Sequence, residues 1–127
     1  MELLQQLHDS AIGGTVAWIF DGAWTTDLGW AGGFNSHSRG NTAQDIVDWL
    51  TATAARAENR TFVDPGDLYI LQVLHDAEIN GSVTWWKPRE GFTVALARHE
   101  ERHFRAWPAA ETWLHSIIAT AALRTSH

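Results

Sequence analysis

The chain contains an internal repeat, and this repeat constrains the fold more than any other feature of the sequence. Leu4–Trp18 aligns without a gap on Leu71–Trp85, at an offset of 67 residues (71 − 4 = 67). At the same offset, Ala52–Ala55 falls on Ala119–Ala122. Because one register holds from the start of the repeat to its end, the sequence predicts a fused pair of similar units related by two-fold pseudo-symmetry.

The two copies are too short to be independent domains. A unit of about 60 residues buries only about 60% of the surface that its unfolded chain exposes, so it is marginally stable alone. We therefore predict a single compact domain over residues 1–127. It consists of repeat 1 (1–60), a linker (61–67) within the polar stretch Arg56 to Gly66, and repeat 2 (68–127).

Hydrophobic periodicity predicts the same order of elements in each copy. Apolar residues at helical spacing begin the unit, a β-branched and aromatic hairpin follows, and an amphipathic helix ends it. Along the chain we expect a helix at 2–11, a hairpin at 15–29, a short strand near 33–38 and a helix at 42–55, then a helix at 68–77, a hairpin at 82–97, a short strand near 103–107 and a helix at 109–122. Gly13–Gly14 and Asn80–Gly81 are expected to end the first helices with positive φ.

These elements predict an α+β fold made of two tandem helix–three-strand–helix repeats. Pairing the two sheets edge to edge removes an exposed edge strand and lets the helices cover one face of a single antiparallel sheet. The chain would then form an intramolecular pseudo-dimer around a shared core.

The composition excludes several classes of function. The net charge is −6 and the nine Lys and Arg residues are scattered, which argues against nucleic-acid binding. The chain has no Cys, no apolar run long enough to span a membrane and no signal-peptide pattern at its start, so we expect a cytoplasmic protein. Its glycines do not match a nucleotide-binding loop, and we expect no cofactor.

Two segments of the repeat resemble a group of short uncharacterised bacterial proteins, which often consist of one repeat. They carry an L-H-D-x-x-I-N-G segment and a W-x-x-D-G-x-W hairpin. The first segment is matched best by Leu74–Gly81, and the hairpin by Trp18–Trp24. In repeat 2, Pro88–Gly91 replaces the Asp-Gly turn of that hairpin. The resemblance covers nearly the whole chain in two copies, supports the repeat, and implies no activity.

The run His99-Glu100-Glu101-Arg102-His103 matches the H-E-x-x-H motif of zinc hydrolases. On a helix, this spacing places both imidazoles on one face to bind Zn²⁺, and the glutamate activates water. Here the run falls between two predicted strands, and Pro108 disfavours a long helix after it. The alternative is a charged, solvated turn, which we favour over a metal site at His99 and His103.

A His-Asp pair occurs in both repeats, as His8-Asp9 and His75-Asp76. A histidine with a carboxylate neighbour can act as a general base or as a ligand. Near the end of a helix it also interacts favourably with the helix dipole and with free carbonyl groups. Adjacent helical residues point about 100° apart, so we do not expect either pair to form a dyad, and we favour a structural role.

Eight Trp residues raise the question of where so much aromatic surface lies. We assign Trp18 and Trp85, which the repeat shares, to the core. By strand alternation, Ile19 and Trp86 then face the other side of the sheet. Trp24 and Trp30 could extend this surface, which could be an interface, a small-molecule cleft or core.

The sequence does not name a function. The hypothesis it favours is a non-catalytic interaction or small-ligand-binding protein that uses the aromatic surface of Ile19, Trp24, Trp30 and Trp86. The expected partner is a second copy of the chain, with another protein or a small molecule as alternatives. The competing hypothesis is a metal-dependent hydrolase that uses His99 and His103. An enzyme is the less favoured of the two classes.

Overall fold

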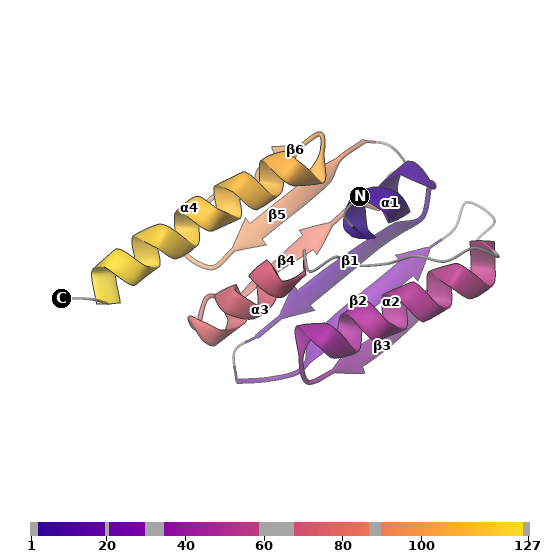
Figure 1. The fold of residues 1–127 in the computed structure, drawn as a ribbon, viewed down its shortest axis with the longest axis horizontal. Helices are drawn as coiled ribbons and strands as arrows, with labels where there is room; N and C mark the ends of the chain where they lie inside the picture. Colours follow the sequence, from indigo (N-terminus) through magenta and orange to yellow (C-terminus); the bar gives the residue numbers. More distant parts are fainter. Residues whose placement is uncertain (1–2, 20, 30–34, 59–67, 87–89, 126–127) are drawn as a thin grey trace.

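A computed structural model describes residues 3–19, 21–29, 35–58, 68–86 and 90–125. Over these residues the chain forms four helices and a six-stranded antiparallel sheet, in the order α-βββ-α twice (Figure 1). The predicted α+β class is therefore confirmed. The elements are α1 (Leu3–Asp9), β1 (Gly13–Trp18), β2 (Trp24–Gly29), β3 (Asn35–Gly40), α2 (Ala43–Glu58), α3 (Tyr69–Asp76), β4 (Gly81–Thr84), β5 (Phe92–Leu96), β6 (Arg102–Phe104) and α4 (Trp107–Thr125).

The sheet joins the two repeats through their first strands. Its order is β3-β2-β1-β4-β5-β6, so the two three-stranded sheets pair edge to edge, as predicted, and β1 and β4 are the neighbours at the centre. Val16 pairs with Val83, and these two residues are equivalent in the repeat (83 − 16 = 67). A pseudo-two-fold axis therefore passes through this pair, perpendicular to the sheet.

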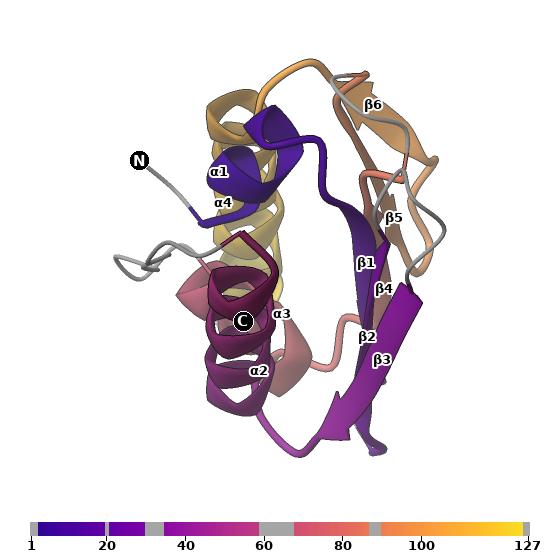
Figure 2. The ribbon, with the colours of Figure 1, turned by 90° about the vertical axis from the view of Figure 1, so that its right-hand side faces the viewer.

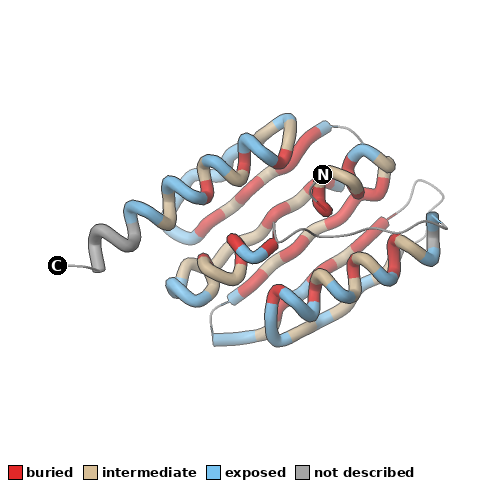
Figure 3. The backbone as a smooth tube through the Cα atoms, viewed as in Figure 1, coloured by how far each residue is buried: buried red, intermediate tan, exposed pale blue. Residues whose placement is uncertain are grey.

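The helices lie on one face of the sheet and leave the other face open (Figure 2). Alternate strand residues point toward the helices and are buried, as the red segments of the strands show in Figure 3. The largest fully buried side chains include Trp18, Trp24, Trp85 and Trp107. Four Trp residues thus fill the space between the two layers, where they bury a large apolar area. No helix of the described residues is long and apolar enough to cross a membrane.

The first helix of each repeat ends at a residue with positive φ, but this residue does not belong to the predicted pairs Gly13–Gly14 and Asn80–Gly81. It is Ala11 (φ 60°) in repeat 1 and Glu78 (φ 64°) in repeat 2. The N–H of Ile12 donates to the carbonyl of Leu7, and Ile79 repeats this bond, which is the hydrogen bonding of a Schellman end.

The glycines that follow these helix ends have another role. A Cβ atom on Gly13 would lie 2.5 Å from the carbonyl oxygen of Trp86, and one on Gly81 would lie 2.7 Å from that of Ala95. Glycine is needed there because neighbouring strands approach closely at the start of β1 and β4.

The 67-residue register does not extend to the end of the repeat. Trp24 pairs with Gly40, 16 positions later, whereas Phe92 pairs with Phe104, 12 positions later. The hairpin of the second and third strands is therefore four residues shorter in repeat 2 (16 − 12 = 4), and hairpins tolerate such length changes at their loop ends. The closing helices consequently correspond at an offset of 64, the difference between their first residues (107 − 43 = 64).

Burial along the closing helices supports the corrected register. At an offset of 64, buried Ile46 aligns with buried Ala110, and buried Leu50 aligns with buried Leu114. The match of Ala52–Ala55 to Ala119–Ala122 thus reflects composition and not structural equivalence.

Several predicted boundaries also move. The third strands are 35–40 and 102–104, so the predicted strand residue Trp107 begins α4. Helix α2 extends to Glu58 and includes the start of the stretch expected to be linker. The linker 61–67 itself lies outside the described residues.

Candidate functional site

The His-Asp pair of each repeat is hydrogen-bonded within the last turn of its helix. Nδ1 of His8 lies 2.9 Å from Oδ1 of Asp9, and Nδ1 of His75 lies 3.0 Å from Oδ1 of Asp76. The expectation that neither pair forms a dyad is therefore wrong. A glutamine one turn earlier binds each carboxylate and helps to hold it near the imidazole: Gln5 donates to Asp9 in the first helix.

Both ring nitrogens of His8 have partners. Nδ1 faces the Asp9 carboxylate and so carries the proton, while Nε2 accepts a 2.9 Å hydrogen bond from the backbone N–H of Gly91. The side chain is 7% exposed and stacks on Phe92, with ring centroids 4.9 Å apart. His8 therefore fastens the hairpin of repeat 2 to the first helix of repeat 1.

His75 has a similar but more open environment. Its side chain is 16% exposed, and its ring lies 5.4 Å from that of Trp24, which corresponds to Phe92 at the start of the second strand. The hydrogen bond from His75, and then the one from Gln72, lower the pKa of Asp76 below its usual value. The ionised carboxylate orients the imidazole, as in a general-base pair, although the equivalent His8 shows that this arrangement also serves packing.

The glutamines beside these pairs connect the two repeats. Oε1 of Gln5 accepts a 2.8 Å hydrogen bond from the backbone N–H of Trp107, at the start of α4. Oε1 of Gln72 accepts one of the same length from Ala43, at the start of α2. Each glutamine thus caps the closing helix of the other repeat. This role is not predicted from the sequence, although the alignment of Gln5 with Gln72 in the repeat is a signal that could have indicated it.

The H-E-x-x-H run does not form a helical motif. His99 lies in the turn between β5 and β6 and packs edge-on against Trp113, with centroids 6.3 Å apart. His103 lies on β6, where its Nδ1 is 3.1 Å from Oγ1 of Thr93. The run therefore lacks the helical spacing that places two imidazoles on one face. Among the described residues, no group of three or more His, Asp or Glu side chains could hold a metal ion.

The open face of the sheet carries two large exposed apolar side chains, Ile19 at 53% and Trp86 at 43% exposure. They are equivalent in the repeat (86 − 19 = 67) and follow strands β1 and β4. Two other residues, Trp24 and Trp30, are also predicted for this surface. Trp24 is fully buried on the helix-covered face, because it pairs with the core residue Trp18, and Trp30 lies outside the described residues.

Ile19 and Trp86 do not form one contiguous apolar patch. Each lies three residues beyond the pseudo-two-fold axis, in opposite directions, so the two are about 20 Å apart along the strands. Between them the open face is covered by small or polar side chains. The open face therefore has fewer aromatic side chains than the sequence suggests, and a polar face of an antiparallel sheet is stable in water.

Two cross-strand rows of side chains form this polar surface. In the first row, the hydroxyl oxygens of Thr15 and Thr84 lie 3.2 Å apart across the junction of the repeats. The complete first row is His37, Asp27, Thr15, Thr84, Thr93 and His103. The second row contains Arg39, Thr25, Ala17, Ser82 and Ala95. Strand alternation could have identified both rows in the sequence, but their alignment depends on the register between strands.

Comparison of the chain with protein-family models, curated proteins and solved structures found no match. The resemblance noted in the sequence therefore gains no support from a relative. Any function must be inferred from the geometry of the open face and of the His-Asp pairs.

Proposed function

We propose that the chain is a non-catalytic interaction protein whose open sheet face binds a macromolecular partner. One observation carries the proposal: Ile19 and Trp86 are exposed at equivalent positions, at opposite ends of the same polar face. Aromatic side chains such as that of Trp86 are enriched in protein–protein interfaces relative to the rest of the surface.

The chemistry of the open face favours a protein partner over a small molecule. Small ligands bind in concave, mostly apolar pockets. This face consists instead of short side chains on adjacent strands, with hydroxyl groups that donate and accept hydrogen bonds. An interface with apolar anchors and a hydrogen-bonding surface between them fits such a face.

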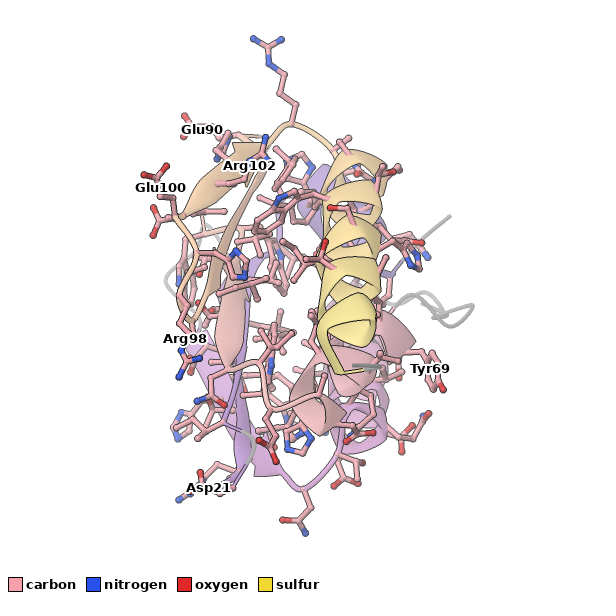
Figure 4. All side chains as sticks on the ribbon, turned by 90° about the vertical axis from the view of Figure 1, so that its left-hand side faces the viewer. Asp21, Tyr69, Glu90, Arg98, Glu100 and Arg102 are labelled. Carbon is pink, nitrogen blue, oxygen red and sulfur yellow. The ribbon has the colours of Figure 1, made fainter. Side chains whose placement is uncertain are left out.

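A pair of matched variants tests this proposal. We expect Trp86→Asp to abolish binding of the partner that the unmodified protein retains in native co-purification, with unchanged circular dichroism. Tyr69→Asp is the control, because Tyr69 is 69% exposed on the helix side of the molecule (Figure 4). If Tyr69→Asp abolishes binding and Trp86→Asp does not, the helices and not the sheet bind the partner.

A further inference from the structure

We infer that the partner of the open face is a second copy of this chain, stacked face to face. The two-fold axis of this dimer runs parallel to the strands, between β1 and β4. The inference rests on the proposed function and adds the identity of the partner. It follows from the charges at the two edges of the face, from the positions of Ile19 and Trp86, and from the area available.

Opposite charges lie at the two ends of the second cross-strand row. Arg39 on β3 pairs with Thr25 at one edge of the sheet. At the other edge, extending the β5–β6 register by one residue from Val94 and Arg102 places Glu101 opposite Ala95. Arg39 and Glu101 are both exposed. They therefore lie at the same height along the strands, equally far from the centre of the sheet.

Within one chain these two charges are too far apart to interact. Five strand spacings separate β3 from β6, which is about 24 Å. This distance exceeds the Debye length of about 8 Å at physiological ionic strength. Any energetic coupling between Arg39 and Glu101 must therefore arise between molecules.

Rotation about an axis parallel to the strands exchanges the two edges of the sheet. It places Arg39 over the partner's Glu101, and Glu101 over the partner's Arg39. A two-fold axis across the strands would instead stack β3 on itself and bring Arg39 toward the partner's His37. Charge complementarity therefore selects the axis parallel to the strands.

The same rotation brings the exposed apolar side chains together. Ile19 meets the partner's Ile19 at one end of the interface, and Trp86 meets the partner's Trp86 at the other end. These contacts are isologous, as a two-fold dimer requires. A face about 24 Å wide and 20 Å long would bury on the order of 1,000 Å² over both copies, which is enough for a weak specific dimer.

A charge-reversal cycle on the full chain tests the inference. Sedimentation velocity over about 10 to 500 µM should show a reversible monomer–dimer equilibrium. We expect Arg39→Glu and Glu101→Arg to weaken dimerisation by about tenfold or more each, and the double variant to restore most of the loss. Arg56→Glu, an exposed change on α2, should leave the dissociation constant unchanged.

The outcomes separate this inference from the proposed function. If the unmodified protein stays monomeric over this range, the second copy is excluded, while a Trp86-dependent partner would still support the interaction surface. If it dimerises but the double charge reversal restores nothing, the face-to-face arrangement about this axis is excluded. A dimer that is unaffected by both Trp86→Asp and the charge reversals would place the dimer interface elsewhere and overturn this inference, while the proposed function would be overturned only if Trp86→Asp also leaves binding of the co-purified partner unchanged.

Discussion

Trp85 donates a 2.9 Å hydrogen bond from its indole Nε1 to the carbonyl oxygen of Ile12, in the other repeat. Trp18 makes the equivalent bond in the opposite direction, at 2.7 Å, to the carbonyl oxygen of Ile79. Each indole thus ties its own strand to the segment that follows the first helix of the other repeat. The core is therefore shared by reciprocal polar contacts as well as by apolar packing, and neither repeat contains all of its own hydrogen-bond partners.

We expect Trp85→Phe to lower the free energy of unfolding by about 2 to 4 kcal/mol, measured by urea denaturation. The change creates a cavity and leaves the buried carbonyl of Ile12 without its donor. Trp86→Phe is the control, because Trp86 is exposed and should change stability by less than about 0.5 kcal/mol. Equal losses from the two variants would contradict the assignment of Trp85 to the shared core.

The two His-Asp pairs differ in how much they stabilise the fold. We expect His8→Phe to cost about 1 to 3 kcal/mol of unfolding free energy, because it leaves the buried N–H of Gly91 without an acceptor. His75→Phe should cost less, since Asp76 is exposed and keeps its hydrogen bond from Gln72. Chemical denaturation of both variants compares the pairs directly. A larger loss of unfolding free energy for His75→Phe than for His8→Phe would contradict the conclusion that the first pair stabilises the fold more.

The repeat in the sequence predicts the centre of the fold well. The segments 4–18 and 71–85 align without a gap, and they contain the strands that join the repeats and the tryptophans that bridge them. The prediction fails beyond these segments because the hairpins that follow differ in length between the two copies. A short Ala-Thr-Ala-Ala match then gives the wrong register for the closing helices, where buried Leu50 and Leu114 give the right one.

The candidate surface was only partly predictable. Alternation along a strand correctly places Ile19 and Trp86 on the face opposite Trp18. It does not reveal that they lie at opposite ends of that face, because this depends on the antiparallel pairing of β1 with β4. The rows that bring Arg39 and Asp27 onto the same face depend on the register of β3, which the sequence does not specify.

The helix ends at Ala11 and Glu78 offer a stabilising change. A left-handed backbone costs a residue other than glycine about 1 to 2 kcal/mol. Glycine avoids this strain, but part of the gain is offset because glycine loses more conformational entropy on folding. We expect Ala11→Gly to raise the melting temperature by about 2 to 4 °C in calorimetry. Ala17→Gly, within strand β1, should lower it. A lower melting temperature for Ala11→Gly would contradict the observed helix end.

The zinc content of the purified protein tests whether the H-E-x-x-H run binds metal. We expect elemental analysis of the purified protein to find no stoichiometric zinc, because His99 lies in a turn and His103 on a strand. A chelator should leave the melting temperature unchanged. Zinc near one equivalent per chain, lost in a His103→Ala variant, would instead support the hydrolase hypothesis.

The stability contributed by Asp76 should depend on pH. Hydrogen bonds from His75 and Gln72 lower the pKa of Asp76 from its usual 3.8. A carboxyl group whose pKa is lower in the folded state stabilises the fold above the unfolded pKa, and this contribution disappears as the pH falls through the folded pKa. We therefore expect the unfolding free energies of the unmodified protein and Asp76→Asn to differ above about pH 3.8 and to converge as the pH falls below it. Urea denaturation at a series of pH values measures this difference, and Asp21→Asn controls for the loss of one exposed charge. The difference in unfolding free energy between the unmodified protein and Asp76→Asn should change between pH 3 and pH 6 by more than it does for Asp21→Asn. If it changes no more than for this control, the bond between His75 and Asp76 does not stabilise the folded chain.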